Sequence, residues 1–327
     1  MQDLTPMRAI VRHRYGSPAV LRFEELEKPV AGDDEVLLRV RAASVNPLDW
    51  HFMRGEPSLL RLVTGLRRPK AARLGVDLAG QVEAAGRNVK GLRPGDEVYG
   101  TSRGAFAEYV CAREKSLAAK PANLTFEEAA AVPVAGCTAL QALRDHGRLE
   151  RGQKVLINGA AGGVGTFAVQ IARSFGAEVT GVCSTGNVEL VRSLGAHLVI
   201  DYTRGDFTAT GRRYDMVLDC VGNRPVTALR RVLTPKGTCV MIGGGGSSVA
   251  ILAGMLGTFL LSWVVSQKLV AFLASVNTPD LTALRGLIES GQVRPVIDRR
   301  YALDKVPEAI AYLEKGHARG KVTIAVA

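Results

Sequence analysis

The stretch KVLINGAAGGVGTFAVQ, residues 154–170, decides the fold of this chain. Val155, Leu156 and Ile157 form a short apolar run that is typical of a buried parallel strand. A glycine-rich turn follows at once, and an amphipathic helical pattern continues from it through Ala168 to Ala172. The segment therefore predicts a strand, a tight turn and a helix in direct succession.

The glycines of this turn have the spacing G-x-x-G-x-x-G. Glycines also serve plain tight turns, but here the turn leads directly into a helix. A helix N-terminus attracts anions, and residues without a Cβ let a pyrophosphate approach the backbone N–H groups. We therefore predict that a dinucleotide binds at Gly159, Ala160, Gly162, Gly163, Val164 and Gly165.

The residues beyond this turn indicate a doubly wound α/β fold. Further short runs rich in β-branched residues alternate with segments of helical character, which predicts a parallel sheet covered by helices. These runs are residues 178–184, 198–202, 214–222 and 237–246. By contrast, residues 7–110 are β-rich and interrupted by many glycines and prolines, as in a compact, irregular barrel.

Length and composition favour a two-domain, water-soluble protein. The chain has 327 residues and a formal net charge of +11, which attracts nucleic acid, anionic membranes or polyanionic cofactors without selecting among them. Its five cysteines are widely spaced and contain no C-x-x-C pair, so we expect reduced thiols. The N-terminal residues contain no apolar signal core, and we expect a cytoplasmic location.

Several motifs carry a family resemblance: NPLDW (46–50), GVDLAG (75–80), GDEVYG (95–100), PVAGCTALQAL (133–143) and GHARGKVTIAV (316–326). Together they resemble the medium-chain dehydrogenase/reductase superfamily, in particular its zinc-independent quinone oxidoreductases, the zeta-crystallin-like branch. The resemblance implies a GroES-like β-rich catalytic domain at residues 1–132 and 275–327, and a Rossmann domain at 133–274. It also implies a homodimer.

Zinc-dependent relatives bind their metal through cysteine, histidine and a third cysteine or aspartate. The matching positions hold Asn46, Val76 and approximately Val134, and valine offers no donor atom to Zn²⁺. We therefore predict that the chain has no catalytic metal site.

The coenzyme is predicted to be NADPH rather than NADH. The carboxylate that binds the ribose hydroxyls of NAD is expected roughly 20 residues past the glycine turn. Here that place holds Ser184, Thr185 and Asn187, whose hydroxyls and amide can donate to a 2′-phosphate. The resemblance adds Tyr202, and Arg192 is a candidate charge partner. An ordinary polar loop is the alternative interpretation.

The remaining candidates follow from the resemblance and from strand ends. Val221 and Gly243 lie where two predicted parallel strands end, and ligands of open α/β sheets collect at such ends. Arg319 and Lys321 are predicted either to reach the coenzyme or to cap the last element. Asn46 and Trp50 lie in a predicted turn that faces the nicotinamide in the family, and both are candidates for positioning substrate. Trp50 is equally compatible with a core position.

Two further stretches remain open. Residues 249–265 are almost wholly apolar, which favours a substrate lid, although a subunit interface or a shallow membrane contact would also explain them. Residues 61–73 hold five basic side chains and no acid, as in a solvated loop or a surface that guides anions. No motif for reading specific nucleic acid is present.

These observations predict an NADPH-dependent, zinc-independent oxidoreductase that transfers hydride to lipophilic quinones or α,β-unsaturated carbonyls. A carbonyl or alcohol dehydrogenase of the same superfamily is the alternative enzyme. A non-catalytic NADPH-binding protein, associated with a membrane surface or RNA, is the alternative outside catalysis.

Overall fold

The computed structural model describes residues 6–242 and 266–326. They form two compact units, and each is described by itself. Unit 1 comprises Met1–Val134, Val276–Ser290 and Pro295–Ala327, and unit 2 comprises Ala135–Ser275 and Gly291–Arg294. The predicted Gly243 and the apolar stretch 249–265 lie outside the described residues.

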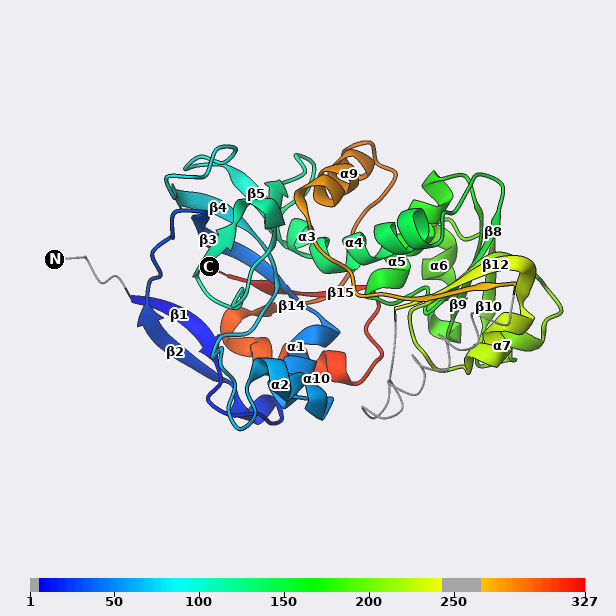
Figure 1. The fold of residues 1–327 in the computed structure, drawn as a ribbon, viewed down its shortest axis with the longest axis horizontal. Helices are drawn as coiled ribbons and strands as arrows, with labels where there is room; N and C mark the ends of the chain where they lie inside the picture. The colour runs from blue at the N-terminus through cyan, green and yellow to red at the C-terminus, as the bar shows by residue number, and fades with distance from the viewer. Residues whose placement is uncertain (1–5, 243–265, 327) are drawn as a thin grey trace. The chain divides into compact units, whose positions relative to one another are not determined.

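Unit 2 contains a six-stranded, all-parallel sheet, which confirms the predicted doubly wound fold (Figure 1). The strand order is β10-β9-β8-β11-β12-β13. The strands are β8 (Lys154–Asn158), β9 (Glu178–Cys183), β10 (Leu198–Asp201), β11 (Tyr214–Asp219), β12 (Leu233–Met241) and β13 (Lys268–Ala271). Strand β13 was not predicted, because its four residues are too few to show a periodic pattern.

The helices of unit 2 connect these strands and bury their apolar faces against the sheet. Within the described part of unit 2 they are α4 (Pro133–Gln141, beginning at the unit boundary), α5 (Gly163–Ser174), α6 (Val188–Ser193) and α7 (Val226–Arg231). Helix α5 buries eight consecutive residues, Gly165–Ala172, as expected for a helix that lies against a sheet.

Unit 1 contains a seven-stranded sheet and a separate two-stranded one. The two-stranded sheet pairs β1 (Pro6–Val11) with β2 (Arg22–Glu27). The larger sheet has the order β14-β15-β3-β4-β5-β7, with β6 also paired to β3. Its strands are β3 (Glu35–Val45), β4 (Asp77–Ala85), β5 (Glu97–Thr101), β6 (Tyr109–Arg113), β7 (Leu117–Ala119), β14 (Ile297–Ala302) and β15 (Lys321–Ala325).

The described residues of unit 1 also form α-helices (Figure 1): α1 (Pro47–Arg54), α2 (Arg61–Thr64), α3 (Phe126–Ala130), α9 (Thr278–Glu289) and α10 (Val306–Glu314). One core cluster joins β3, β4 and β15 to residues of α10, including Ala309 and Ile310. The C-terminal segment thus completes the core that the N-terminal segment begins.

Two glutamine side chains explain where the chain divides between the units. Gln141 forms two hydrogen bonds with the backbone of Ser275. Its Nε2 donates to the Ser275 carbonyl (2.7 Å), and its Oε1 accepts from the Ser275 N–H (3.2 Å). Gln170 binds both backbone groups of Arg294 in the same way. The two hydrogen bonds between Gln170 and Arg294 explain why residues 291–294 join unit 2. The sequence had predicted that all residues from 275 to 327 belong to the catalytic domain.

The segment NPLDW is the start of a helix and not the predicted turn. Asn46 is extended (φ −125°, ψ 157°), Pro47 occupies the first helical turn, and the Asp49 carboxylate accepts the Asn46 backbone N–H at 2.8 Å. The same residues favour turns, which is why the local pattern did not distinguish a turn from a helix start.

None of the helices within the described residues has the length and apolar character that a membrane span requires.

Candidate active site and coenzyme-binding turn

The predicted glycine turn lies at the carboxyl end of β8 and leads directly into α5. Gly159 has φ +83°, a conformation that favours glycine. A Cβ on Gly165 would lie 2.1 Å from the Gly159 carbonyl oxygen, so only glycine allows this close approach. Gly162 is the N-cap residue of α5 and makes no side-chain cap.

This geometry leaves the first N–H groups of α5 available to an anion. The earliest backbone bond of the helix is Thr166 N–H to the Gly162 carbonyl (3.0 Å), so the preceding N–H groups have no acceptor within the helix. The helix dipole adds a partial positive charge at the same point. All six residues predicted to bind the dinucleotide lie in this turn or in the first turn of α5, and a pyrophosphate fits the chemistry of that place.

A polar cluster, in which Asn158 and Asp219 are buried and Asn223 is exposed, lies at the same edge of the sheet beside the end of β11. Asn158 Nδ2 donates to Asp219 Oδ1 (2.9 Å) and to Asn223 Oδ1 (3.0 Å). Asp219 Oδ1 also accepts the backbone N–H groups of Val221 and Gly222. These bonds hold Val221 against the turn, since a Cβ on Gly159 would lie 2.6 Å from Val221 Cγ2. Sequence reasoning named Val221 but missed Asn158, which ends the buried strand β8, and Asn223, which lies in the loop after β11.

The loop after β9 contains the predicted phosphate-binding side chains. Asn187 Nδ2 donates to Ser184 Oγ (3.0 Å), which holds these two side chains together. Thr185 Oγ1 donates to Asp201 Oδ2 (2.6 Å) and contacts Thr203 Oγ1 (2.8 Å). Asp201 ends β10, the neighbouring strand, where it pairs with Cys183.

The sequence prediction for this loop included hydroxyls and an amide but no carboxylate. The Asp201 carboxylate therefore changes the electrostatics expected there. Hydrogen bonds from Thr185, and then from Thr203, lower the pKa of Asp201, although some desolvation opposes them. The exposed guanidinium of Arg204 lies 3.4 Å from the carboxylate and lowers the pKa further. Arg192, the predicted charge partner, instead pairs with Glu189 at 2.6 Å.

Tyr202 follows Asp201 and is 47% exposed, so its ring is available to a ligand. Its backbone N–H donates to the Cys183 carbonyl (3.1 Å), which places the residue beside the loop that follows β9.

In unit 1, Asn46 and Lys321 belong to one buried network (both at most 3% exposed). The Lys321 ammonium donates to Asn46 Oδ1 (2.6 Å), the Val45 carbonyl (3.2 Å) and Asp77 Oδ2 (3.3 Å). These three acceptors use all its N–H groups. The coenzyme contact predicted for Lys321 would therefore require one of these bonds to open, and that contact stays a prediction.

Asp77 is the centre of this network, and sequence reasoning missed it. Its Oδ2 accepts Asn46 Nδ2 (2.9 Å) and Ser44 Oγ (2.9 Å), and its Oδ1 accepts the backbone N–H of Val134 (3.0 Å). The strands β3, β4 and β15 supply the three side chains Ser44, Asp77 and Lys321. The signal in the sequence was a single carboxylate inside the apolar motif GVDLAG.

Asp49 is wholly buried next to this network, and burial raises its pKa to about 7. The Asn46 N–H bond lowers the pKa, the charge of Asp77 raises it, and the charge of Lys321 lowers it again. Among the described residues Asp49 Oδ1 has no hydrogen-bond partner. The group thus shifts toward its neutral form near neutral pH.

Trp50 and Arg319 lie in unit 1 as well. Trp50 is half-buried against the unit 1 core, and its ring stacks on His51 with the centroids 3.7 Å apart. Arg319 precedes β15, and its backbone N–H donates to Asp298 Oδ2 (3.0 Å). The ligand contacts of Asn46, Trp50 and Arg319 stay predictions.

The residues at the zinc-matching positions do not fit a metal. Asn46 uses its amide within the buried network, whereas Val76 and Val134 have no donor atoms in their side chains. Within residues 6–242 and 266–326 no group of three His, Cys, Asp or Glu side chains is arranged to hold a metal ion.

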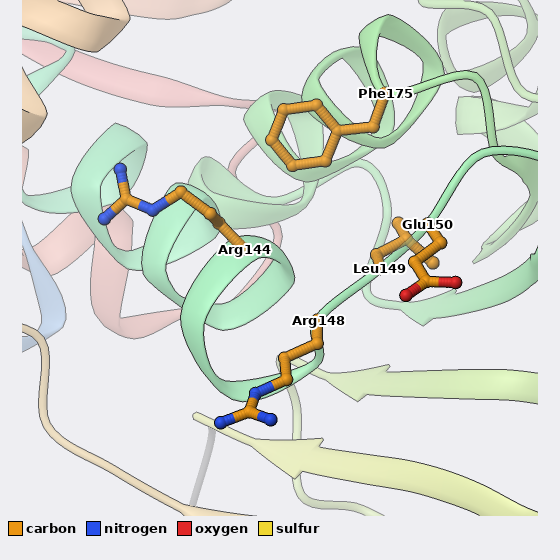
Figure 2. Close-up of a pocket in the computed structure, with 5 residues that line it drawn as sticks. All are labelled: Arg144, Arg148, Leu149, Glu150 and Phe175. Carbon is orange, nitrogen blue, oxygen red and sulfur yellow. The ribbon is translucent and has the colours of Figure 1, made fainter.

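A cavity of about 510 Å³ lies elsewhere in unit 2. Figure 2 shows its lining, which includes Arg144, Arg148 and Phe175. It lies at the opposite end of β8 from the glycine turn, because its residues Leu149 and Glu150 lead into that strand and Phe175 follows the end of α5. It is therefore not part of the coenzyme-binding turn.

Protein-family models match a segment in each half of the chain. Residues 32–122 match the alcohol dehydrogenase GroES-like domain, and residues 194–324 match the family described as zinc-binding dehydrogenase. A 2-methylene-furan-3-one reductase of Solanum lycopersicum is 37% identical over 95% of this chain and 76% of its own length. An NADPH-dependent alkenal/one oxidoreductase of Arabidopsis thaliana is 34% identical over 97% of this chain and 79% of its own length.

Among solved structures, the quinone oxidoreductase of Coxiella burnetii has a TM-score of 0.86 and 30% identity, and it covers 99% of this chain and 100% of its own. The chain therefore belongs to the medium-chain dehydrogenase/reductase superfamily. Within it, the chain lies in the quinone oxidoreductase branch and is an oxidoreductase, as the sequence predicted. The homodimer and the cytoplasmic location stay predictions.

Proposed function

We propose that this enzyme transfers hydride from NADPH to a quinone or to the C=C bond of an α,β-unsaturated carbonyl, without a catalytic metal. The observation that carries the proposal is the chemistry at the positions that match zinc ligands. Asn46 is bonded to Lys321 and Asp77, and the two valines offer no ligand. Alcohol oxidation relies on a Lewis acid to stabilise the alkoxide, whereas an electron-poor acceptor chiefly needs placement.

The glycine turn supports a nicotinamide dinucleotide as the coenzyme, which supplies the hydride when bound. Its pyrophosphate would lie against the free N–H groups at the start of α5, where a Cβ on Gly165 has no room. The names of the relatives support the acceptor class, since they include an alkenal/one oxidoreductase, a furanone reductase and a quinone oxidoreductase.

The loop after β9 supports NADPH, with a smaller preference than the sequence alone suggested. Ser184, Asn187 and the exposed Arg204 offer donors or positive charge to a 2′-phosphate. Asp201 opposes that phosphate, because its negative charge lies within hydrogen-bond distance of Thr185. We therefore propose that Arg204 and Asp201 act in opposite directions on coenzyme preference.

The decisive experiment measures reduced-coenzyme consumption with a quinone, with an enone and with a simple ketone, and NADP⁺ reduction with a primary alcohol. We expect steady NADPH oxidation with the first two acceptors. Faster turnover of the ketone or the alcohol would overturn the proposal in favour of a carbonyl or alcohol dehydrogenase.

The same assay tests the coenzyme assignment through kcat/KM for NADPH and for NADH. We expect Arg204→Gln to lower the NADPH value selectively and Asp201→Asn to raise it, each by roughly fivefold, since each substitution removes one charge near the 2′-phosphate. Arg192→Gln is the control, because Arg192 pairs with Glu189. Equal effects on both coenzymes would contradict a 2′-phosphate site here.

A further inference from the structure

Residues 58–70 of unit 1, which we call the docking segment, expose an unusual group of aliphatic side chains. The segment contains a 3₁₀ turn (Ser58–Leu60), helix α2 and a short loop to Lys70. Leu62, Val63 and Leu66 are 64%, 74% and 67% exposed. Together with Leu59 they make up four of the ten large hydrophobic residues exposed in the described chain. Such concentration indicates an interaction surface, since scattered exposed residues are ordinary.

The backbone beneath these side chains is anchored, so their exposure does not come from poor packing. The Tyr15 hydroxyl bonds Thr64 Oγ1 (2.8 Å) and donates to the Gly65 carbonyl (2.7 Å). Arg61 donates to the Gly55 carbonyl (3.0 Å), and its guanidinium lies 4.7 Å from the centre of the Tyr15 ring. The segment thus presents its aliphatic side chains from a fixed scaffold.

Positive charge accompanies this apolar surface. The sequence holds five basic residues between Glu56 and Asp77 and no acidic one. Arg61 and Arg73 are turned to interior acceptors, since Arg73 Nη1 contacts the Tyr109 carbonyl at 3.4 Å. Arg67, Arg68 and Lys70 are exposed, and no ion pair is found for them within the described residues. Three unpaired cations therefore border the aliphatic group.

The combination of exposed aliphatic side chains with neighbouring cations favours some classes of binding partner over others. A second copy of the chain, placed symmetrically on the segment, would bring the same cations face to face. Nucleic acid gains affinity from aromatic stacking, and residues 58–70 contain no aromatic side chain. An anionic bilayer accepts both features, since aliphatic side chains enter the boundary between headgroups and acyl chains while cations meet lipid phosphates.

We propose that residues 58–70 dock this protein peripherally on anionic lipid membranes. Leu62, Val63 and Leu66 enter the interfacial region, and Arg67, Arg68 and Lys70 contact the headgroups.

The test is co-sedimentation of the full chain with vesicles of phosphatidylcholine alone and of phosphatidylcholine mixed with phosphatidylglycerol. We expect binding only to the mixed vesicles, with affinity that falls as salt rises. Arg67→Gln/Arg68→Gln should weaken binding roughly 25-fold, at about fivefold per charge removed. Leu62→Ser/Val63→Ser should weaken it by about tenfold or more.

Matched controls separate docking from general attraction between a basic protein and an anionic surface. Arg93→Gln/Arg103→Gln removes two exposed charges elsewhere, and Val30→Ser removes an equally exposed aliphatic side chain. Both should bind as the unchanged protein does. Absence of binding to mixed vesicles, or equal weakening by the controls, would overturn the proposal. So would concentration-dependent dimerisation that Leu62→Ser/Val63→Ser abolishes, because it would assign the surface to a second copy.

Discussion

Gly165 and Asp49 show how single residues control the two halves of this enzyme. Gly165 matters through the side chain it lacks, since its backbone lies directly against the Gly159 carbonyl. Asp49 matters through its raised pKa, because burial disfavours its ionised form. Each makes a prediction that one substitution tests.

We expect Gly165→Ala to weaken NADPH binding by more than tenfold and to lower the free energy of unfolding by about 1–3 kcal/mol. The added Cβ would lie 2.1 Å from the Gly159 oxygen, so the turn must shift. Coenzyme titration and thermal unfolding measure the two effects. Gly205→Ala is the control, because a Cβ there meets nothing within 4 Å. Unchanged coenzyme affinity in Gly165→Ala would show that this turn does not hold the pyrophosphate.

Asp49 should make stability depend on pH between about 4 and 7. Its pKa rises from an ordinary 3.8 to about 7 on folding, so the folded state holds a proton that the unfolded state has released. The free energy of unfolding therefore falls as pH increases through this window, by at most about 4 kcal/mol. Urea unfolding at several pH values measures the slope.

Asp49→Asn should flatten that slope, whatever its effect on stability at one pH. Asp304→Asn, at a half-exposed carboxylate, should leave the slope unchanged. If the slope of the Asp49→Asn variant matched that of the unchanged protein, the titrating group would lie elsewhere.

At the scale of elements, the Lys321–Asp77 pair joins strands from the two ends of the chain. Strand β15 lies beside β3 in the sheet, and β3 pairs with β4, which begins at Asp77. The ammonium of Lys321 on β15 contacts both the end of β3 and Asp77. The family's C-terminal motif therefore has a structural task inside unit 1.

We expect Lys321→Met to destabilise the protein by about 3–5 kcal/mol, because it leaves the buried Asp77 carboxylate without its cation. Lys305→Met, at an exposed lysine, should cost less than about 1 kcal/mol. Chemical unfolding measures both. In Lys321→Met/Asp77→Asn the loss should be smaller than the sum of the single losses. Strict additivity would contradict a direct coupling between the two groups.

At the scale of the whole molecule, the residues at the zinc-matching positions support the proposed metal-independent reaction, and the composition gives the chain a net positive charge. The net charge of +11 favours anionic ligands generally, whereas Arg67, Arg68 and Lys70, for which the described residues show no ion pair, support the proposed membrane contact. The residues at the zinc-matching positions predict that catalysis does not depend on bound zinc, and this prediction can be tested directly.

Prolonged treatment with a strong zinc chelator should leave quinone and enone reduction within about twofold of the untreated rate, since the matched positions supply no zinc ligand set. A zinc-dependent alcohol dehydrogenase carried through the same treatment is the positive control. Loss of activity that added Zn²⁺ restores would contradict the metal-free assignment, and metal analysis of the purified protein would locate the cause.

The sequence alone determined the fold class, the glycine turn and the family. These features are local: an apolar strand, small residues and a helical period follow one another between residues 154 and 172, so neighbouring positions carry the whole signal. Tertiary structure decided what distant residues do to one another. It brought Asp201 against Thr185 across adjacent strands and enclosed Lys321 with Asp77, 244 positions away. Burial and charge depend on such contacts, and no local pattern records them.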